Sequence, residues 1–199
     1  MNHSKEEPLF SSKIPARGQS LVELAITLPF LLILFLGMTE VGYYMYATIA
    51  VHNTAREAAR VAAKEPQFST NTIDMWASKV MTDVLQSASA SFLAPSGKDD
   101  TVIVTHLLTD SSGTITTCES KSAIWPDTGA PGADTSRFTC ADLQTLINQM
   151  PSTIGSGFEQ DEFILVEYYH HHYPIIGLTV VMPQGVELYS YTVMRVIGQ

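Results

Sequence analysis

Basic residues are scarce in this chain, and one long stretch has none. The 199 residues contain 11 Lys and Arg against 20 Asp and Glu, which gives a formal net charge of −9. An acidic chain without a basic patch argues against nucleic acid as a partner. The charged fraction of 16% is low for a soluble protein, largely because residues 18–55 contain no Lys or Arg and only Glu23 and Glu40 as acids.

Familiar catalytic and cofactor motifs are also missing. There is no Gly-rich phosphate loop, no Cys-x-x-Cys pair and no Gly-x-Ser-x-Gly elbow. Ser, His and Asp are common, but no spacing fixes a catalytic trio, so the sequence predicts neither an enzyme nor a cofactor. His170, His171 and His172 are adjacent, and on a strand His170 and His172 would share one face. Pairing and surface exposure explain most such clusters, so we expect no metal, with a metal-dependent hydrolase as the alternative.

The chain has two cysteines, Cys118 and Cys140, separated by a segment with two prolines and two glycines. Disulfides persist outside the cytoplasm, so an exported C-terminal part would favour a Cys118–Cys140 bond. In the chain-entropy model, closing a loop of this length stabilises the fold by roughly 3 kcal/mol. The alternative is two unrelated thiols, one of them buried.

Residues 1–18 have the character of a leader. They hold three basic and two acidic residues, a net charge of +3 − 2 = +1, so the remainder carries −9 − 1 = −10. A basic leader before an acidic remainder predicts a cytoplasmic N-terminus and a C-terminal part in the periplasm or outside the cell. The alternative is a cleaved secretory signal peptide, but the apolar run that follows is too long for one.

The apolar run predicts a membrane-spanning helix. From Leu24 to Val51 the chain is apolar or weakly polar except at Glu40, and a bilayer core needs about 20 such residues. We expect one helix over residues 19–65, spanning the membrane in about 24–46 and ended by Pro66. Pro29 should bend this helix or open one backbone hydrogen bond. Small residues recur on one face between Ala47 and Ala63, and we expect that face to pack on this protein's own C-terminal domain.

Residues 66–199 predict a small exported α+β domain, in which a second helix packs on an antiparallel sheet. The expected helices cover residues 72–92 and, more briefly, 142–150, the latter capped by Thr139 or Asp142. The expected strands cover residues 101–108, 114–118, 163–173 and 186–197. The apolar segment 174–185 either covers the core or touches the membrane or a partner.

The spacing of Gly18 and Glu23 carries the functional hypothesis. A glycine at a cleavage site suits a peptidase that admits no side chain there. A carboxylate at the edge of an apolar helix is costly unless it has a specific partner. The ammonium group released at Gln19 by cleavage after Gly18 would be such a partner.

The segment RGQSLVELAITLPFLLILFLGMTEVGYYMYATIAVHNTAREAARVAA resembles the N-terminus of TadE-like proteins, minor pseudopilins of tight-adherence (Flp, type IVc) pili. The resemblance covers residues 17–63 closely, with Gly18, Glu23, Pro29 and Glu40 as hallmarks. It implies that a prepilin peptidase cuts between Gly18 and Gln19. It also implies assembly beside the major Flp pilin and a sister minor pilin, driven by an inner-membrane platform. The chain is far too long to be the major Flp pilin itself.

Two further interpretations stay open on the sequence alone. The chain could be a single-pass membrane-anchored binding or adhesion module that is never cut at Gly18. Glu40 could lie at the outer headgroup level, where Tyr43, Tyr44 and Tyr46 would form an aromatic belt in the lipid bilayer, or it could face a partner in the filament.

Overall fold

The computed structural model describes residues 18–64, 100–125, 135–149, 161–174 and 185–196. The chain divides into two compact units, Met1–Val41 and Gly42–Gln199, which we describe separately. The leader up to residue 17, the helix expected at 72–92 and the apolar residues 175–184 lie outside the described residues.

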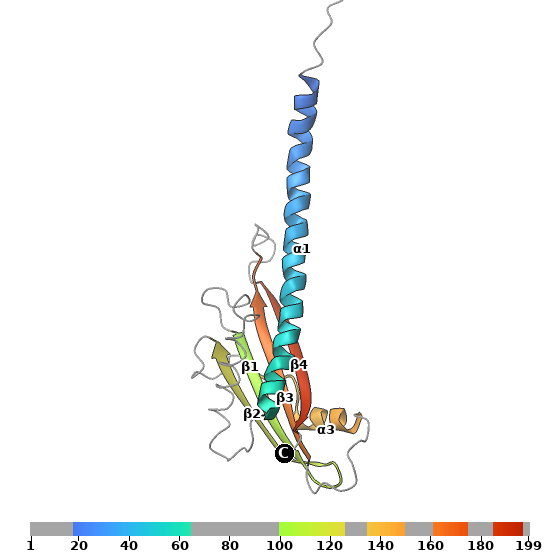
Figure 1. Cartoon of the computed structure of the whole chain (residues 1–199), viewed down its shortest axis with the longest axis vertical. Helices are drawn as coiled ribbons and strands as arrows, with labels where there is room; N and C mark the ends of the chain where they lie inside the picture. Colours follow the sequence, from blue (N-terminus) through green and yellow to red (C-terminus); the bar gives the residue numbers. More distant parts are fainter. Residues whose placement is uncertain (1–17, 65–99, 126–134, 150–160, 175–184, 197–199) are drawn as a thin grey trace, which may run out of the picture. The chain divides into compact units, whose positions relative to one another are not determined.

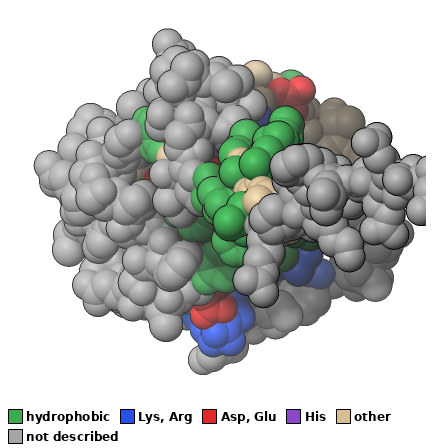
Figure 2. All heavy atoms as spheres, turned by 90° about the horizontal axis from the view of Figure 1, so that it is seen from above, with side chains coloured by type: hydrophobic (Ala, Val, Ile, Leu, Met, Phe, Trp, Pro, Cys, Tyr) green, Lys and Arg blue, Asp and Glu red, His purple; other side chains and the backbone are tan. Residues whose placement is uncertain are grey.

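Helix α1, Gln19–Lys64, is 46 residues long and runs without interruption through Pro29 (Figure 1). Its limits agree with the sequence prediction. In the first unit its large apolar side chains are exposed, and hydrophobic atoms dominate the end of the helix seen in Figure 2. Among the described residues, α1 is the one helix long and apolar enough to cross a membrane, and its most apolar stretch of 18 residues has a mean hydropathy of 2.4. This supports a single-pass membrane anchor.

The second unit is built on a four-stranded antiparallel sheet in the order β2-β1-β3-β4. The strands are β1 (Asp100–Thr109), β2 (Ile115–Trp125), β3 (Asp161–His172) and β4 (Val186–Val196). Asp110 organises the tight turn between β1 and β2, because its Oδ1 accepts the backbone amides of Ser112 and Thr114 at 2.9 Å. Gly113 completes this turn with a φ of 82°, which favours glycine.

The second half of α1 covers one face of this sheet, which we call the helix face. The alanine-rich side of α1 is fully or almost fully buried there against aliphatic side chains of β1, β3 and β4 and against Tyr168. The helix residues in this contact are Ala47, Ala50, Val51, Ala55, Ala58, Ala59 and Ala62. Small side chains let the helix backbone approach the sheet closely. The prediction that the alanine face packs on the protein's own domain is therefore confirmed.

Helix α3, Cys140–Gln149, packs on the opposite face, which we call the disulfide face. Its Leu143 and Ile147 are buried against Leu107, Phe163 and Leu165 of the sheet. The fold is thus α+β, as predicted: a long apolar N-terminal helix followed by a small domain with an antiparallel sheet and a second helix. The described second helix is the short one expected at 142–150, and it begins two residues earlier.

One strand prediction was too short. The sequence indicated a strand over residues 114–118, whereas β2 continues to Trp125. The missed half includes the exposed residues Glu119, Ser120 and Lys121. β2 is an edge strand, and its polar outward surface lacks the dense β-branched pattern by which β1 was found.

Candidate functional site

The predicted cleavage position lies where α1 begins. Gly18 is in a turn, its carbonyl oxygen accepts the Val22 amide at 3.3 Å, and the helix starts at the next residue. A Cβ placed on Gly18 would meet no atom of the described residues within 4 Å. The packing of those residues therefore does not require glycine at this position.

The other predicted assembly residues lie farther along the same helix. The side chain of Glu23 is exposed one turn inside α1, among exposed leucines and isoleucines. Pro29 has no amide hydrogen, so it cannot donate the usual helical hydrogen bond to the carbonyl of Ala25. The helix nevertheless continues through this position. Glu40 differs from Glu23 because its side chain is only 8% exposed. The four hallmark positions are thus spread along α1 rather than gathered at one place.

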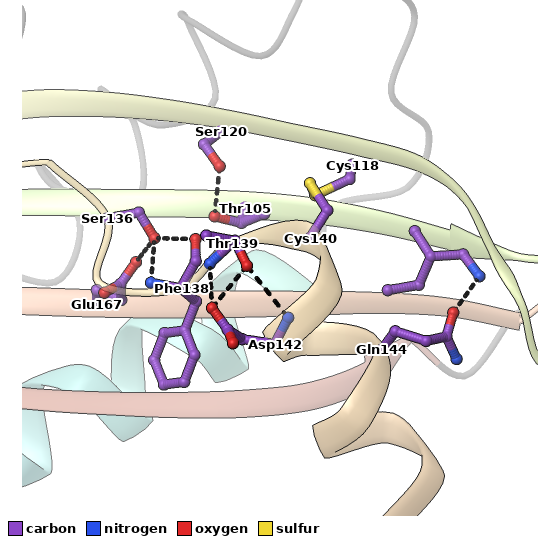
Figure 3. The surroundings of a disulfide bond; sticks show 11 residues. Thr105, Cys118, Ser120, Ser136, Phe138, Thr139, Cys140, Asp142, Gln144 and Glu167 are labelled. Atoms are coloured by element: carbon purple, nitrogen blue, oxygen red, sulfur yellow. Dashed lines mark hydrogen bonds between the residues drawn. A yellow bond between two sulfur atoms is a disulfide. The ribbon is translucent and has the colours of Figure 1, made fainter.

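The cysteine pair joins β2 to α3. The sulfur atoms of Cys118 and Cys140 are 2.03 Å apart, a disulfide bond that agrees with the predicted pairing (Figure 3). Thr139 caps the helix beside it: the Asp142 amide donates to Thr139 Oγ1 at 3.3 Å, and the Thr139 amide donates to Asp142 Oδ2 at 2.9 Å. The Thr139 hydroxyl, which donates to the same Oδ2 at 2.6 Å, and then the Thr139 amide hold the pKa of Asp142 below its usual value. Of the two cap candidates proposed from the sequence, Thr139 is the N-cap.

A buried carboxylate holds the segment before α3 against the disulfide face, and sequence reasoning did not find this role. Glu167 is fully buried on β3. Its Oε2 accepts the Ser136 hydroxyl at 2.5 Å, and its Oε1 accepts the Arg137 amide at 3.0 Å and the Tyr189 hydroxyl at 2.8 Å (Figure 3 shows the Ser136 bond). Tyr169 Oη lies 3.1 Å from the same Oε1. Burial, and then the bond to Glu167, raise the pKa of Tyr189.

Arg137 extends this network to the surface. Its guanidinium lies over the ring of Tyr189, 4.0 Å from the ring centroid, and forms an ion pair with Glu187. Half of the Arg137 side chain is exposed, so this ion pair is a weak one. Only a slight signal in the sequence pointed to the role of Glu167, namely that it is the one acid within the apolar run of β3. A buried ionised side chain at such a place needs several hydrogen-bond donors.

The histidine cluster is divided between the two faces of the sheet. His170 and His172 lie on the helix face, as the strand periodicity predicted, while His171 points to the other face together with Glu167. His170 Nδ1 lies 2.8 Å from Asp100 Oδ1, and Tyr168 donates its hydroxyl to Asp100 Oδ2 at 2.5 Å. All three side chains are buried, and burial raises the pKa of Tyr168 well above its usual value.

The remaining histidines have neighbours of their own. His172 packs against the ring of Tyr43, with centroids 4.8 Å apart, and His106 Nε2 lies 2.6 Å from Glu162 Oε1. Within the described residues, no three His, Cys, Asp or Glu side chains converge in a way that could hold a metal ion. His52 Nδ1 lies 2.8 Å from Ser190 Oγ, but Ser190 is only 2% exposed, so a substrate could not reach that hydroxyl. These polar groups stabilise the sheet.

Among the described residues, the one long apolar helix suggests a single-pass membrane anchor. Residues 18–60 match the model of the TadE-like protein family, so this segment of the chain is TadE-like. The family is associated with tight-adherence pili in general and is not known as enzymatic. No curated protein and no solved structure matches the chain. The family match covers Gly18, Glu23, Pro29 and Glu40 and ends before the sheet begins.

Proposed function

We propose that this protein is a minor pilin or pseudopilin that takes part in the assembly of tight-adherence (Flp, type IV) pili after a prepilin peptidase cleaves the leader after Gly18. Residues 1–18 would form the leader, α1 the membrane and filament helix, and residues 66–199 the exported domain. The observation that supports this most directly is the place of Gly18, immediately before the first helical residue of a TadE-like segment.

The open space at Gly18 favours a constraint that comes from outside the chain. Within the described part of the chain, nothing lies within 4 Å of the position of the missing Cβ. A glycine that folding does not demand fits a peptidase pocket that excludes side chains. Cleavage there would leave Gln19 at the first position of α1 with a free ammonium group.

Glu23 supplies the second half of the mechanism. A cationic amine at a helix N-terminus is unfavourable, because the helix dipole already places partial positive charge there. An exposed carboxylate among leucine side chains is equally unfavourable in hydrocarbon. Pairing the ammonium of one subunit with Glu23 of its neighbour would remove both costs, and it would fix the register of the incoming helix. Pro29 and Glu40 are proposed to adjust the packing of the same helix.

The proposed topology places the N-terminus in the cytoplasm and the sheet domain in the periplasm or outside the cell. The disulfide supports this orientation, because such bonds persist in oxidising compartments. The proposed partners are a prepilin peptidase, the major Flp pilin, a sister minor pilin and the inner-membrane assembly platform.

Leader cleavage is tested by determining the N-terminus of the protein purified from its native membrane. We expect mature protein to begin at Gln19 and Gly18→Phe to accumulate with its leader attached. Because no atom of the described residues lies within 4 Å of a Cβ at position 18, Gly18→Phe should retain its disulfide and its thermal unfolding temperature. An intact Met1 in assembled pili would instead indicate an anchored binding or adhesion module that is not processed.

The role of Glu23 is tested separately. Glu23→Ala should be cleaved normally but should fail to enter pili, as judged by immunoblotting of sheared fibres. Thr27→Ala is the matched control, because it removes an exposed polar side chain from the next turn of α1. Normal pili from the Glu23→Ala strain would contradict the proposed pairing while leaving cleavage intact.

A further inference from the structure

The outward side of α1 in the second unit carries a basic stripe, defined as Arg56, Arg60 and Lys64. These residues follow one another at intervals of four and therefore share one helix face. All three are exposed, whereas the alanine residues on the opposite side are buried against the sheet. The side chain of Arg60 is 56% exposed even though it is paired with Glu57. The packing of the helix therefore presents the stripe to the surroundings.

The sequence alone indicated no basic patch, because Arg56, Arg60 and Lys64 are separated along the chain, but the helix places them on one face. Residues 42–64 carry three basic residues and Glu57, a net charge of +3 − 1 = +2. Residues 65–199 carry five basic and fifteen acidic residues, a net charge of +5 − 15 = −10. The basic stripe and the rest of the second unit's sequence thus carry opposite net charges, so the stripe of one molecule is attracted to the acidic domain of a neighbour.

Part of the anionic remainder lies at described positions. Glu119 is exposed on the edge strand β2. The hydrogen bonds that Asp110 and Asp142 accept in their turn and helix cap hold the pKa of each carboxyl below its usual value. Both stay negatively charged at neutral pH, so the attraction does not depend on an unusual ionisation.

We propose that the basic stripe binds the acidic domain of a second copy of this chain in a head-to-tail contact. Two basic stripes would repel each other, so the contact joins different surfaces of the two molecules. Such contacts do not close on themselves unless the rotation between subunits happens to form a ring, and they extend into open rows as a filament requires. The proposal deepens the proposed function but depends on neither cleavage at Gly18 nor the pairing of Glu23.

Anionic lipid is a weaker candidate for the occupant. The expected membrane span ends near Tyr46, and Arg56 lies ten residues farther on, about 15 Å along an α-helix. The headgroup layer on each side of a bilayer is about 5–8 Å thick. On an upright helix the stripe would stand beyond that layer.

The test measures self-association of the full chain in a neutral detergent by sedimentation velocity. Raising the salt concentration from about 0.01 M to about 1 M shortens the Debye length from about 30 Å to about 3 Å, so association through the stripe should weaken steeply. Association that is absent at low salt, or insensitive to salt, would overturn the proposal. If association requires added anionic lipid, the stripe binds lipid rather than a second copy of the chain, and the proposal is again overturned.

Two single charge reversals locate the contact. Arg56→Glu should raise the dissociation constant about three- to ten-fold, because it replaces an attraction by a repulsion. Lys121→Glu is the matched control: it reverses an exposed charge on β2 and gives the same net charge, −9 − 2 = −11. Arg56→Lys, which keeps the positive charge, should have the dissociation constant of the wild-type protein. Equal weakening by Arg56→Glu and Lys121→Glu would mean that total charge alone matters, which refutes a specific stripe.

A mixing experiment tests the head-to-tail arrangement. The double variant Arg56→Glu/Arg60→Glu loses the stripe but keeps its acidic domain, so it should not associate with itself and should still bind wild-type protein. Failure to bind wild-type protein, with the variant's disulfide and thermal unfolding unchanged, would contradict the arrangement. Self-association of the double variant with wild-type affinity would contradict it equally.

Discussion

Replacement of Glu167 by alanine should unfold the sheet domain at markedly lower denaturant concentration. The size of the effect depends on which donors lose their only acceptor. Ser136 can still donate its hydroxyl to the Phe138 carbonyl at 3.2 Å, and Tyr169 can still reach the Thr135 carbonyl at 3.1 Å. The Arg137 amide and the Tyr189 hydroxyl have Glu167 as their acceptor among the contacts described above.

Two hydrogen bonds to a charged acceptor are therefore lost outright. Hydrogen bonds to charged groups contribute about 1.5–3 kcal/mol each, so we expect Glu167→Ala to lower the free energy of unfolding by about 3–6 kcal/mol. Glu187→Ala is the matched control on the same face. Its carboxylate is partly exposed in a surface ion pair, and its removal should cost less than about 1 kcal/mol.

The assay is pulse proteolysis of the full chain in detergent across a urea series, which reports the fraction of folded sheet domain. If Glu167→Ala and Glu187→Ala shift the midpoint equally, the buried network around Glu167 does not stabilise the domain. Glu167→Gln should shift the urea midpoint by an amount between those of Glu167→Ala and Glu187→Ala. The glutamine side chain keeps one acceptor oxygen, but its NH₂ group is a donor that would face the Ser136 hydroxyl or the Arg137 amide.

Three further outcomes are expected from the same structure. The Cys118→Ser/Cys140→Ser double variant should lose about 3 kcal/mol of stability in a urea titration, because the unfolded chain is no longer closed into a loop between residues 22 positions apart. A loss below about 1 kcal/mol would contradict this. Tyr168 keeps its proton in the folded state, whereas the unfolded tyrosine ionises near pH 10, so the free energy of unfolding should fall as the pH rises above about 10. In Tyr168→Phe it should fall less steeply. The same slope for both proteins in an alkaline titration of unfolding would refute the raised pKa of Tyr168. Ala59→Leu should cost about 1–3 kcal/mol by overpacking the fully buried contact of α1 with the sheet; unchanged thermal unfolding would show that the contact can adjust.

The long helix and most of the sheet could be predicted because their signals are local. Pro66 bounds α1, and the recurrence of alanine on one side marks the buried face that the structure shows. The β-branched run of β1 and the apolar run of β3 likewise identified strands. Local signals failed on β2, where exposed polar residues on an edge strand resemble a loop in composition.

The polar networks could not be predicted because their members are distant in sequence. Glu167 binds Ser136 and Arg137 from a segment about 30 residues earlier, and Asp100 meets His170 from 70 residues away. Only the register of β1 on β3 brings Asp100 and Tyr168 to neighbouring positions on one face. The cysteine pair was an exception, since the expected compartment and the presence of only two thiols left one partner for each.

The alanine contact between α1 and the sheet has a mechanical consequence. Its buried residues extend from Ala47 to Ala62, which is about 22 Å along the helix axis. A pull directed along the helix would load this whole length in shear, so every row of contacts would have to slip together. A pull across the helix would open the rows one after another at far lower force. The domain therefore resists tension along α1, which in the proposed pilus role is the direction in which a fibre would pull it.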